Sequence, residues 1–314
     1  MARKLRIQYA GAIYHVMNRG NHREDIFYNN TDRKLFLETL AEACAKTDWQ
    51  VHAWCLMSNH FHLIVETPKA NLVSGMKWFL GTYTSRFNRR HELFGHLFSG
   101  RYKSLFVDGS GNGYLKSVCD YVHLNPVRAK LLSGRQKLAD YRWSSYGEYL
   151  KSPRERWPWL RVDRLFGEWG IPKDSPAGRQ HFERLVETRR ASEDPEERKK
   201  IERGWCYGSQ AFRDELLAQM NEKKGVEHYG QEIRESAEAK AERIVKHELK
   251  KHHWDEGELT RRRKGDPSKI KIAQRLRKET TMTSAWIAAR LQMGTKTHLS
   301  HLLYWHKPEK NKSH

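Results

Sequence analysis

The stretch WCLMSNHFHLIVE, residues 54–66, contains two apolar, strand-like runs that are separated by a tight turn at Ser58 and Asn59. Side chains alternate between the two faces of a strand, so His60 and His62 are expected to project from the same side of the second run. Two imidazoles held in this way by a rigid sheet can bind one metal ion. A His-x-His pair in a strand is, taken alone, more often structural than metal-binding.

The first 150 residues alternate strand-like and helical patterns. Apolar runs at 13–17, 51–57, 61–66 and 102–107 predict four strands. Helical spacing predicts a helix capped by Thr31 and Asp32, a second over about 71–90, and a third over about 114–123, which Pro126 helps to end. The order strand-helix-strand-strand-helix-strand is typical of the ferredoxin-like fold, an antiparallel sheet with helices packed on one face. The sequence therefore predicts an α+β domain over residues 1–150.

The rest of the chain is predicted to be helical. Residues 151–230 contain clustered prolines and a densely charged stretch, so we expect a connector with helical segments. Residues 231–314 are expected to form an all-helical, basic domain that binds DNA.

A helix-turn-helix is predicted near the C-terminal end. Ser284 would cap its first helix, Gly294 would end that helix, and Thr295 would cap the second. The second helix would present four side chains to a DNA groove: Lys296, Thr297, His298 and Ser300. The basic run at 261–264 could bind phosphates beside them. A plain helical hairpin with a basic surface is the alternative.

Composition narrows the partners of the chain. The formal net charge is +20, from 58 basic and 38 acidic side chains, which favours a polyanionic partner. The 11 Trp and 13 Tyr suit stacking on unpaired bases. No apolar run approaches the ~20 residues of a membrane span, and the N-terminus has no signal-peptide pattern. The four cysteines are scattered, so neither a zinc site nor a disulfide framework is indicated, and a cytoplasmic location is expected.

A tyrosine and an asparagine lie four residues apart in YVHLNP, residues 121–126. Tyr121 and Asn125 would share one helix face and could approach the same metal ion as the histidine pair. An ion held by two imidazoles and an amide oxygen keeps positions open for phosphate oxygens. Such mixed ligands fit Mg²⁺ or Mn²⁺. A tyrosine beside such an ion could attack the bound phosphate, and Tyr121 is the first candidate for this nucleophile. Tyr114, two turns earlier on the same helix, is the rival candidate. Tyr121 could instead be an ordinary core residue.

Three segments together resemble the single-tyrosine HUH transposases: WCLMSNHFHLI (54–64), GRYKS (100–104) and YVHLNPVRA (121–129). The chain is most similar to the REP-associated tyrosine transposases of the insertion-sequence-200-like family, over about residues 6–150. The resemblance implies that His60 and His62 bind a divalent cation, and that Tyr121 attacks a DNA phosphodiester and becomes linked to the 5′ phosphate. Asn125 falls where related enzymes place a polar third ligand.

The resemblance also implies that the substrate is single-stranded DNA beside a hairpin. Arg101 and Lys103, in the matched GRYKS segment, and Arg86, on the predicted 71–90 helix, are expected to contact the DNA backbone. Glu66 shares the face of the histidine pair and is either an outer-shell group or a rim residue. Relatives include monomers and dimers, so a homodimer stays open. The alternative function is a DNA-binding regulator that retains the fold without cutting DNA.

Overall fold

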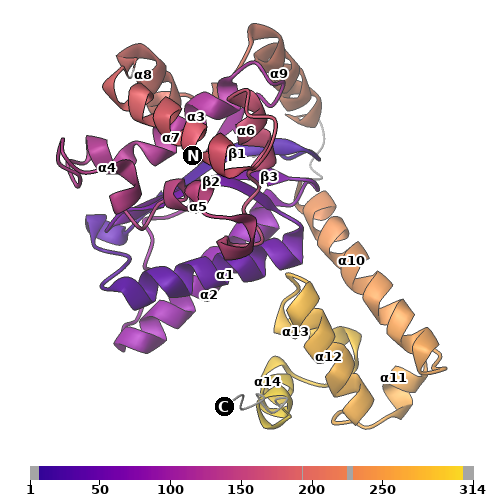
Figure 1. The fold of residues 1–314 in the computed structure, drawn as a ribbon. Helices are drawn as coiled ribbons and strands as arrows, with labels where there is room; N and C mark the ends of the chain where they lie inside the picture. Colours follow the sequence, from indigo (N-terminus) through magenta and orange to yellow (C-terminus); the bar gives the residue numbers. More distant parts are fainter. Residues whose placement is uncertain (1–6, 193, 225–228, 307–314) are drawn as a thin grey trace.

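A five-stranded sheet, in the order β2-β3-β1-β4-β5, forms the centre of the first part of the molecule (Figure 1). The computed structural model describes residues 7–192, 194–224 and 229–306. The first four strands are antiparallel, and a short fifth strand pairs with β4 in parallel. The strands are β1 (Ala12–Arg19), β2 (Gln50–Leu56), β3 (His60–Thr67), β4 (Lys103–Val107) and β5 (Cys206–Tyr207). With one helix after β1 and one after β3, this is the predicted ferredoxin-like arrangement, and the α+β class is confirmed.

The two faces of the sheet have different covers. Helices α1 (Asn30–Thr47) and α2 (Leu72–His91) cover one face, where the Phe61 ring of β3 lies 5.0 Å from that of Phe36 and 6.4 Å from that of Phe79. The opposite face carries α3 (Tyr114–His123), which contacts β2, β3 and β4. Because neighbouring side chains alternate, Phe61, Leu63 and Val65 point to α1 and α2, whereas His62 points to α3.

The start of α1 shows why a helix begins there. The Asn29 side chain accepts hydrogen bonds from the backbone N–H groups of Thr31 and Asp32, while Asp32 accepts from the backbone of Asn29. This capping box satisfies helix donors that have no intrahelical partner. The cap is therefore Asn29, two residues before Thr31 and three before Asp32.

Residues 151–230, predicted as a connector, contain helices, one strand of the sheet and residues of the hydrophobic core around the sheet. Leu165, Phe182 and Ile201 are buried in the same hydrophobic cluster as the sheet, and β5 lies in this stretch. Much of it therefore forms a layer over α3 instead of a linker, because its apolar side chains need a core to pack against. Its helices and those just before it are α4 (Asn125–Arg128), α5 (Tyr146–Leu150), α6 (Asp163–Glu168), α7 (Pro176–Ala191), α8 (Pro195–Arg203) and α9 (Gln210–Lys224). Short 3-10 turns are η1 (Asn21–Arg23), η2 (Leu138–Asp140) and η3 (Pro153–Glu155).

The C-terminal part is helical, as predicted, and has its own hydrophobic cluster. Its helices are α10 (Tyr229–Lys251), α11 (Glu258–Arg261), α12 (Pro267–Glu279), α13 (Ser284–Arg290) and α14 (Lys296–Trp305). Thr283, not Ser284, caps α13, because its side chain accepts from Trp286 N–H. Thr295 caps α14 as predicted, and Gly294 before it has a φ of +86°, a conformation that favours glycine. No helix in the described ranges is both long and apolar enough to cross a membrane.

Candidate active site

An open cleft of about 700 Å³ lies on the α3 side of the sheet, between β1, β3, the segment before β4 and the start of α4. Six residues singled out in the sequence line it: His60, His62, Tyr121, Asn125, Arg101 and Lys103. The structure therefore brings together residues that span more than sixty positions of the chain. Their functional roles stay predictions.

His60 lies at the edge of the cleft, and one of its ring nitrogens is engaged in a hydrogen bond. Its Nδ1 lies 2.8 Å from Asn59 Oδ1, and the Asn59 amide nitrogen donates to the Arg23 carbonyl at 2.9 Å. The second bond fixes which way the amide points, so Asn59 Oδ1 accepts and His60 Nδ1 carries the proton. In that tautomer His60 Nε2 keeps its lone pair, which is the form that binds a metal.

His62 has an equivalent partner that sequence reasoning missed. Its Nδ1 lies 2.9 Å from Nε2 of His15 on β1, and both side chains are buried. When His62 donates this bond, its Nε2 likewise keeps a lone pair. His15 sits diagonally across from His62, since Met17 is the residue directly opposite His62 in the β1–β3 pairing. A histidine in the first predicted strand was visible in the sequence, but its partner depends on the strand register.

All three histidines are neutral at physiological pH. Burial lowers the pKa of His60 to about 4 and of His15 to about 3, and it lowers the pKa of His62 well below its ordinary value. Neighbouring positive charge acts in the same direction, from Arg19 on His60 and from Arg128 on His15. A neutral imidazole is the ligand form, so protons compete weakly for this pair.

Tyr121 projects from α3 toward the histidines. Its ring centroid lies 5.8 Å from that of His62 and 5.6 Å from that of His15. The Arg128 guanidinium of α4 stacks on the Tyr121 ring, 4.1 Å from its centroid, and donates to the Tyr121 backbone carbonyl. The rival, Tyr114, packs against Tyr207 of β5 with ring centroids 5.3 Å apart and does not line the cleft.

Asn125 starts α4 and faces the same cleft. It is 8% exposed, and its Nδ2 is a buried polar atom without a hydrogen-bond partner among the described residues. Pro126 falls in the first turn of α4, where a missing N–H group costs little, so the chain stays helical beyond α3. A metal ligand from this amide would be its Oδ1, whereas the unpartnered Nδ2 is a hydrogen-bond donor that could bond a phosphate oxygen.

The candidate metal ligands are thus two imidazoles and an amide. In the described part of the chain, no group of three or more His, Cys, Asp or Glu side chains is arranged to hold a metal ion. The residues present fit a divalent cation that binds weakly and keeps open positions, because the histidines are neutral and have their Nδ1 atoms engaged.

The cleft is rich in positive charge. Arg19 and Arg23 line it in addition to the exposed Arg101 and Lys103, whereas Glu202 of α8 contributes a carboxylate. Arg19 is the last residue of β1 and Arg23 lies in η1 just after it; nothing in the local sequence pattern placed either of them beside the histidines. Such a surface attracts a polyanion and suits a phosphodiester backbone.

Two predicted residues lie elsewhere. Arg86 pairs with Glu42 of α1 at 2.7 Å and does not line the cleft, since α2 covers the other face of the sheet. Glu66 lies at the far end of β3 and bonds His52 at 2.9 Å and Arg164 at 2.8 Å. An outer-shell role for Glu66 at the histidine pair is therefore excluded by its position, and it holds the chain after η3 to the sheet.

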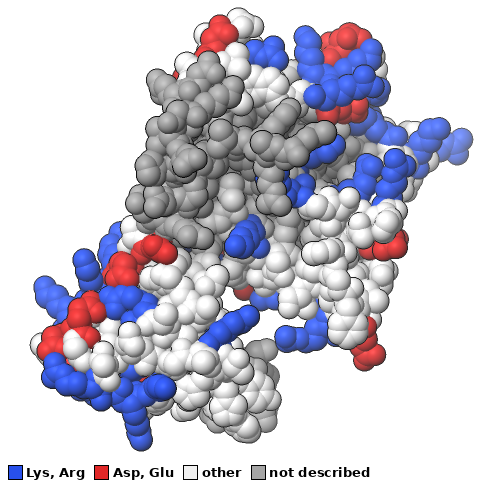
Figure 2. Space-filling model, turned by 180° about the vertical axis from the view of Figure 1, so that it is seen from behind, with Lys and Arg blue, Asp and Glu red and all other residues white. Residues whose placement is uncertain are grey.

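The predicted groove-facing residues of α14 are all exposed: Lys296, Thr297, His298 and Ser300. His298 Nδ1 lies 2.9 Å from the Met293 carbonyl, so its ring is partly fixed to the turn before α14. In the basic run upstream, Arg261 pairs with Asp255 and Arg262 pairs with Glu258. Figure 2 shows basic side chains interleaved with acidic ones at this end of the molecule. Much of the run's charge is therefore balanced within the chain.

Residues 8–125 match the family model described as "Transposase IS200 like". The match contains the histidine pair, Tyr121 and Asn125, and it confirms the resemblance to this family that the sequence predicted for this segment. A solved structure titled "Structure of the REP associates tyrosine transposase bound to a REP hairpin" is similar at 15% identity and a TM-score of 0.39, covering 52% of this chain and 93% of that chain. No curated protein matches the chain.

Proposed function

We propose that the chain is a metal-dependent transposase that cleaves and rejoins single-stranded DNA through a phosphotyrosine at Tyr121. The observation that carries the proposal is the meeting of three features in one basic cleft of an IS200-like domain. These are a neutral histidine pair with both Nδ1 atoms engaged, an adjacent tyrosine, and a buried amide. His60, His62 and Asn125 would hold Mg²⁺ or Mn²⁺.

Tyr121 would act as the nucleophile. A phenol has a pKa of ≈10 and is mostly protonated at neutral pH, so it needs stabilisation of its charged form. The Arg128 guanidinium on its ring favours developing negative charge and restrains the ring. When bound, the divalent cation supplies Lewis-acid polarisation of the phosphate.

The chemistry exchanges one phosphodiester for another. The Tyr121 oxygen forms a bond to phosphorus, and the bond from phosphorus to the 3′ oxygen of the preceding nucleotide breaks. The phenol gives up its proton and the departing oxygen gains one, which yields a 5′-phosphotyrosine and a free 3′ hydroxyl. A second 3′ hydroxyl can then reverse the step and join strands without ATP.

The basic residues of the cleft would bind the strand, with Arg101 and Lys103 on backbone phosphates. A hairpin beside the cleavage site follows from the family resemblance, and a cytoplasmic location follows from the scattered cysteines. Both belong to the proposal. Exposed residues of α14 would contact duplex DNA, which makes the helical domain a separate reader.

The test is a covalent adduct assay. Hairpin-flanked single strands labelled at the 3′ end are incubated with protein and Mn²⁺, and adducts are separated on a denaturing gel. Wild type and Tyr114→Phe should form the adduct, and Tyr121→Phe should form none. An adduct with Tyr121→Phe would refute the choice of nucleophile. DNA binding without any adduct, with Mg²⁺ or Mn²⁺, would favour the non-cleaving regulator.

A further inference from the structure

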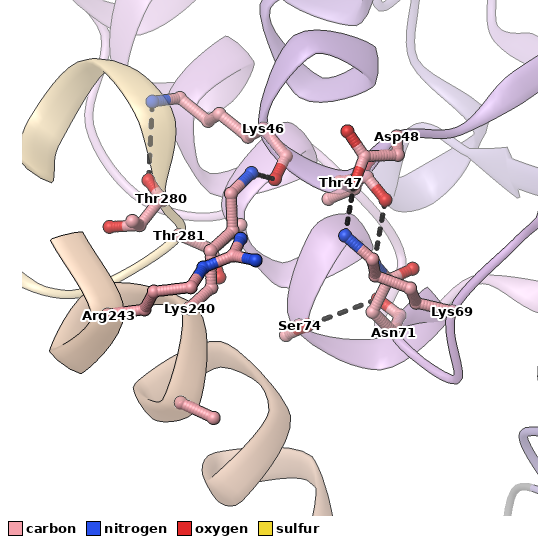
Figure 3. Close-up of a pocket in the computed structure, with 11 residues that line it drawn as sticks. Lys46, Thr47, Asp48, Lys69, Asn71, Ser74, Lys240, Arg243, Thr280 and Thr281 are labelled. Atoms are coloured by element: carbon pink, nitrogen blue, oxygen red, sulfur yellow. Dashed lines mark hydrogen bonds and ion pairs between the residues drawn. The ribbon is translucent and has the colours of Figure 1, made fainter.

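A second cavity, of about 310 Å³, lies between the sheet domain and the helical domain (Figure 3). Its walls come from the end of α1, the segment between β3 and α2, helix α10 and the residues after α12. None of its lining residues lines the catalytic cleft. Four cationic side chains and one carboxylate face it: Lys46, Lys69, Lys240, Arg243 and Asp48.

Two of the lysines join the domains. Lys46 Nζ donates to the backbone carbonyls of Lys278 at 2.8 Å and of Thr280 at 3.3 Å, at the end of α12. Lys240 Nζ donates to the Lys46 carbonyl at 2.8 Å, at the end of α1. Carbonyls at helix ends have no intrahelical partner, so each lysine caps a helix of the other domain. Structural capping therefore accounts for these two side chains.

Arg243 has no such role. Within the described residues its guanidinium makes no hydrogen bond or ion pair, and it extends from α10 into the cavity (Figure 3). The one carboxylate, Asp48, is already paired with Lys69 at 2.5 Å. Four cations minus one anion leave a formal charge of +3 around the cavity.

This positive charge is only partly compensated. Burial lowers the pKa of Lys46 to about 8 and also lowers that of Lys240, and the neighbouring cations Arg277 and Lys240 add to the effect on Lys46. Crowded like charges disfavour one another, so an anion in the cavity would relieve the repulsion. The free guanidinium provides planar, two-pronged donors that match a phosphate.

We propose that the cavity binds a phosphate group, with Arg243 as its principal ligand and Lys240 and Lys69 beside it. The phosphate would belong either to a nucleic-acid backbone or to a small phosphate-containing ion. Because the walls come from both domains, binding would strengthen their docking. The nucleic-acid source rests on the proposed function, whereas the site itself does not.

The first test measures thermal unfolding of the full chain in sodium phosphate and in sodium chloride at equal ionic strength. Phosphate should raise the melting temperature of wild type above its value in chloride. Arg243→Gln should lose that difference. Lys246→Gln, which changes an exposed lysine of the same helix outside the cavity, should keep it. Circular dichroism confirms that each variant is folded.

The second test identifies the source of the phosphate. Single-stranded and duplex oligonucleotides are titrated at several salt concentrations into Tyr121→Phe protein with and without Arg243→Gln. Loss of one phosphate contact should reduce the salt slope by ≈0.7 for a single strand or ≈0.9 for a duplex. A reduced slope assigns the site to nucleic acid, and an unchanged slope with phosphate-specific stabilisation assigns it to a small ion.

The proposal is overturned if phosphate stabilises wild type no more than chloride does and the slope is unchanged. It is also overturned if Lys246→Gln alters both readouts as much as Arg243→Gln, because that result indicates general electrostatics. Neither readout requires cleavage, so failure here is distinguishable from failure of the Tyr121 adduct assay.

Discussion

Replacement of His15 by phenylalanine tests whether the candidate metal site depends on a histidine that is not itself a ligand. The variant keeps an aromatic ring in the buried position, where the His15 and His62 rings lie 5.1 Å apart at 23°. It removes the ring nitrogen that lies 2.9 Å from His62 Nδ1. His62 then loses the bond that fixes its tautomer and ring orientation.

The expected cost follows from that single bond. Loss of an outer partner of a metal-bound histidine typically weakens metal affinity by ~10–100-fold. This corresponds to about 1.4–2.8 kcal/mol of binding free energy. The unpaired Nδ1–H of His62 stays buried, so a loss of about 1–3 kcal/mol in folding stability is expected as well.

Mn²⁺ binding can be measured by the electron paramagnetic resonance signal of the free ion, without DNA. His15→Phe should bind Mn²⁺ ~10–100-fold more weakly than wild type. His15→Gln should recover part of the affinity, because its side-chain oxygen can accept the His62 bond. His52→Phe is the matched control, since His52 is also a buried histidine with one bond, to Glu66, outside the cleft. A folded His15→Phe protein with wild-type Mn²⁺ affinity would refute the positioning role.

Three further predictions concern charge and packing. The pKa of Lys46 is about 8 in the folded chain, against an ordinary value of 10.5, so between these pH values the unfolded chain binds more protons. The stability of wild type relative to Lys46→Met, measured by urea titration, should therefore rise with pH, on the order of 2 kcal/mol after solvent screening. A flat difference from pH 8 to 10.5 would contradict this. Arg101→Gln should reduce the salt slope of single-strand binding by ~0.7, whereas Arg86→Gln should leave it unchanged in the same titration; equal effects would place both side chains on the DNA. Gly75→Ala would put a Cβ 2.2 Å from the buried Trp49 ring, so denaturant unfolding should show a loss of about 1–3 kcal/mol, and an unchanged midpoint would show that the ring can move.

The local pattern of the sequence predicted much of the first domain. Alternation placed His60 and His62 on one face of β3, and helical spacing placed Tyr121 on the helix that covers that face. These properties depend on residues within one strand or helix, where the period of side-chain directions is fixed by backbone geometry. Capping positions were less secure, because Asn29, Thr31 and Asp32 are all acceptable caps.

Contacts between distant segments needed the tertiary structure. The partner of His62 is set by how β1 aligns with β3, and the stacking of Arg128 on Tyr121 depends on the break between α3 and α4. Glu66 shares a strand face with the histidines, yet its position beyond them brings it to Arg164 instead.

By itself, then, the sequence determined the element types, the α+β class, the family that the first domain resembles and the candidates for the chemistry. Only the folded chain decided which candidates share a cleft, that residues after 151 pack onto the sheet, and that Lys46 reaches the end of α12. The physical reason is the distance along the chain over which each kind of interaction acts. Periodicity and capping act over a few residues, whereas register and domain docking are settled by packing and charge among segments up to 234 residues apart.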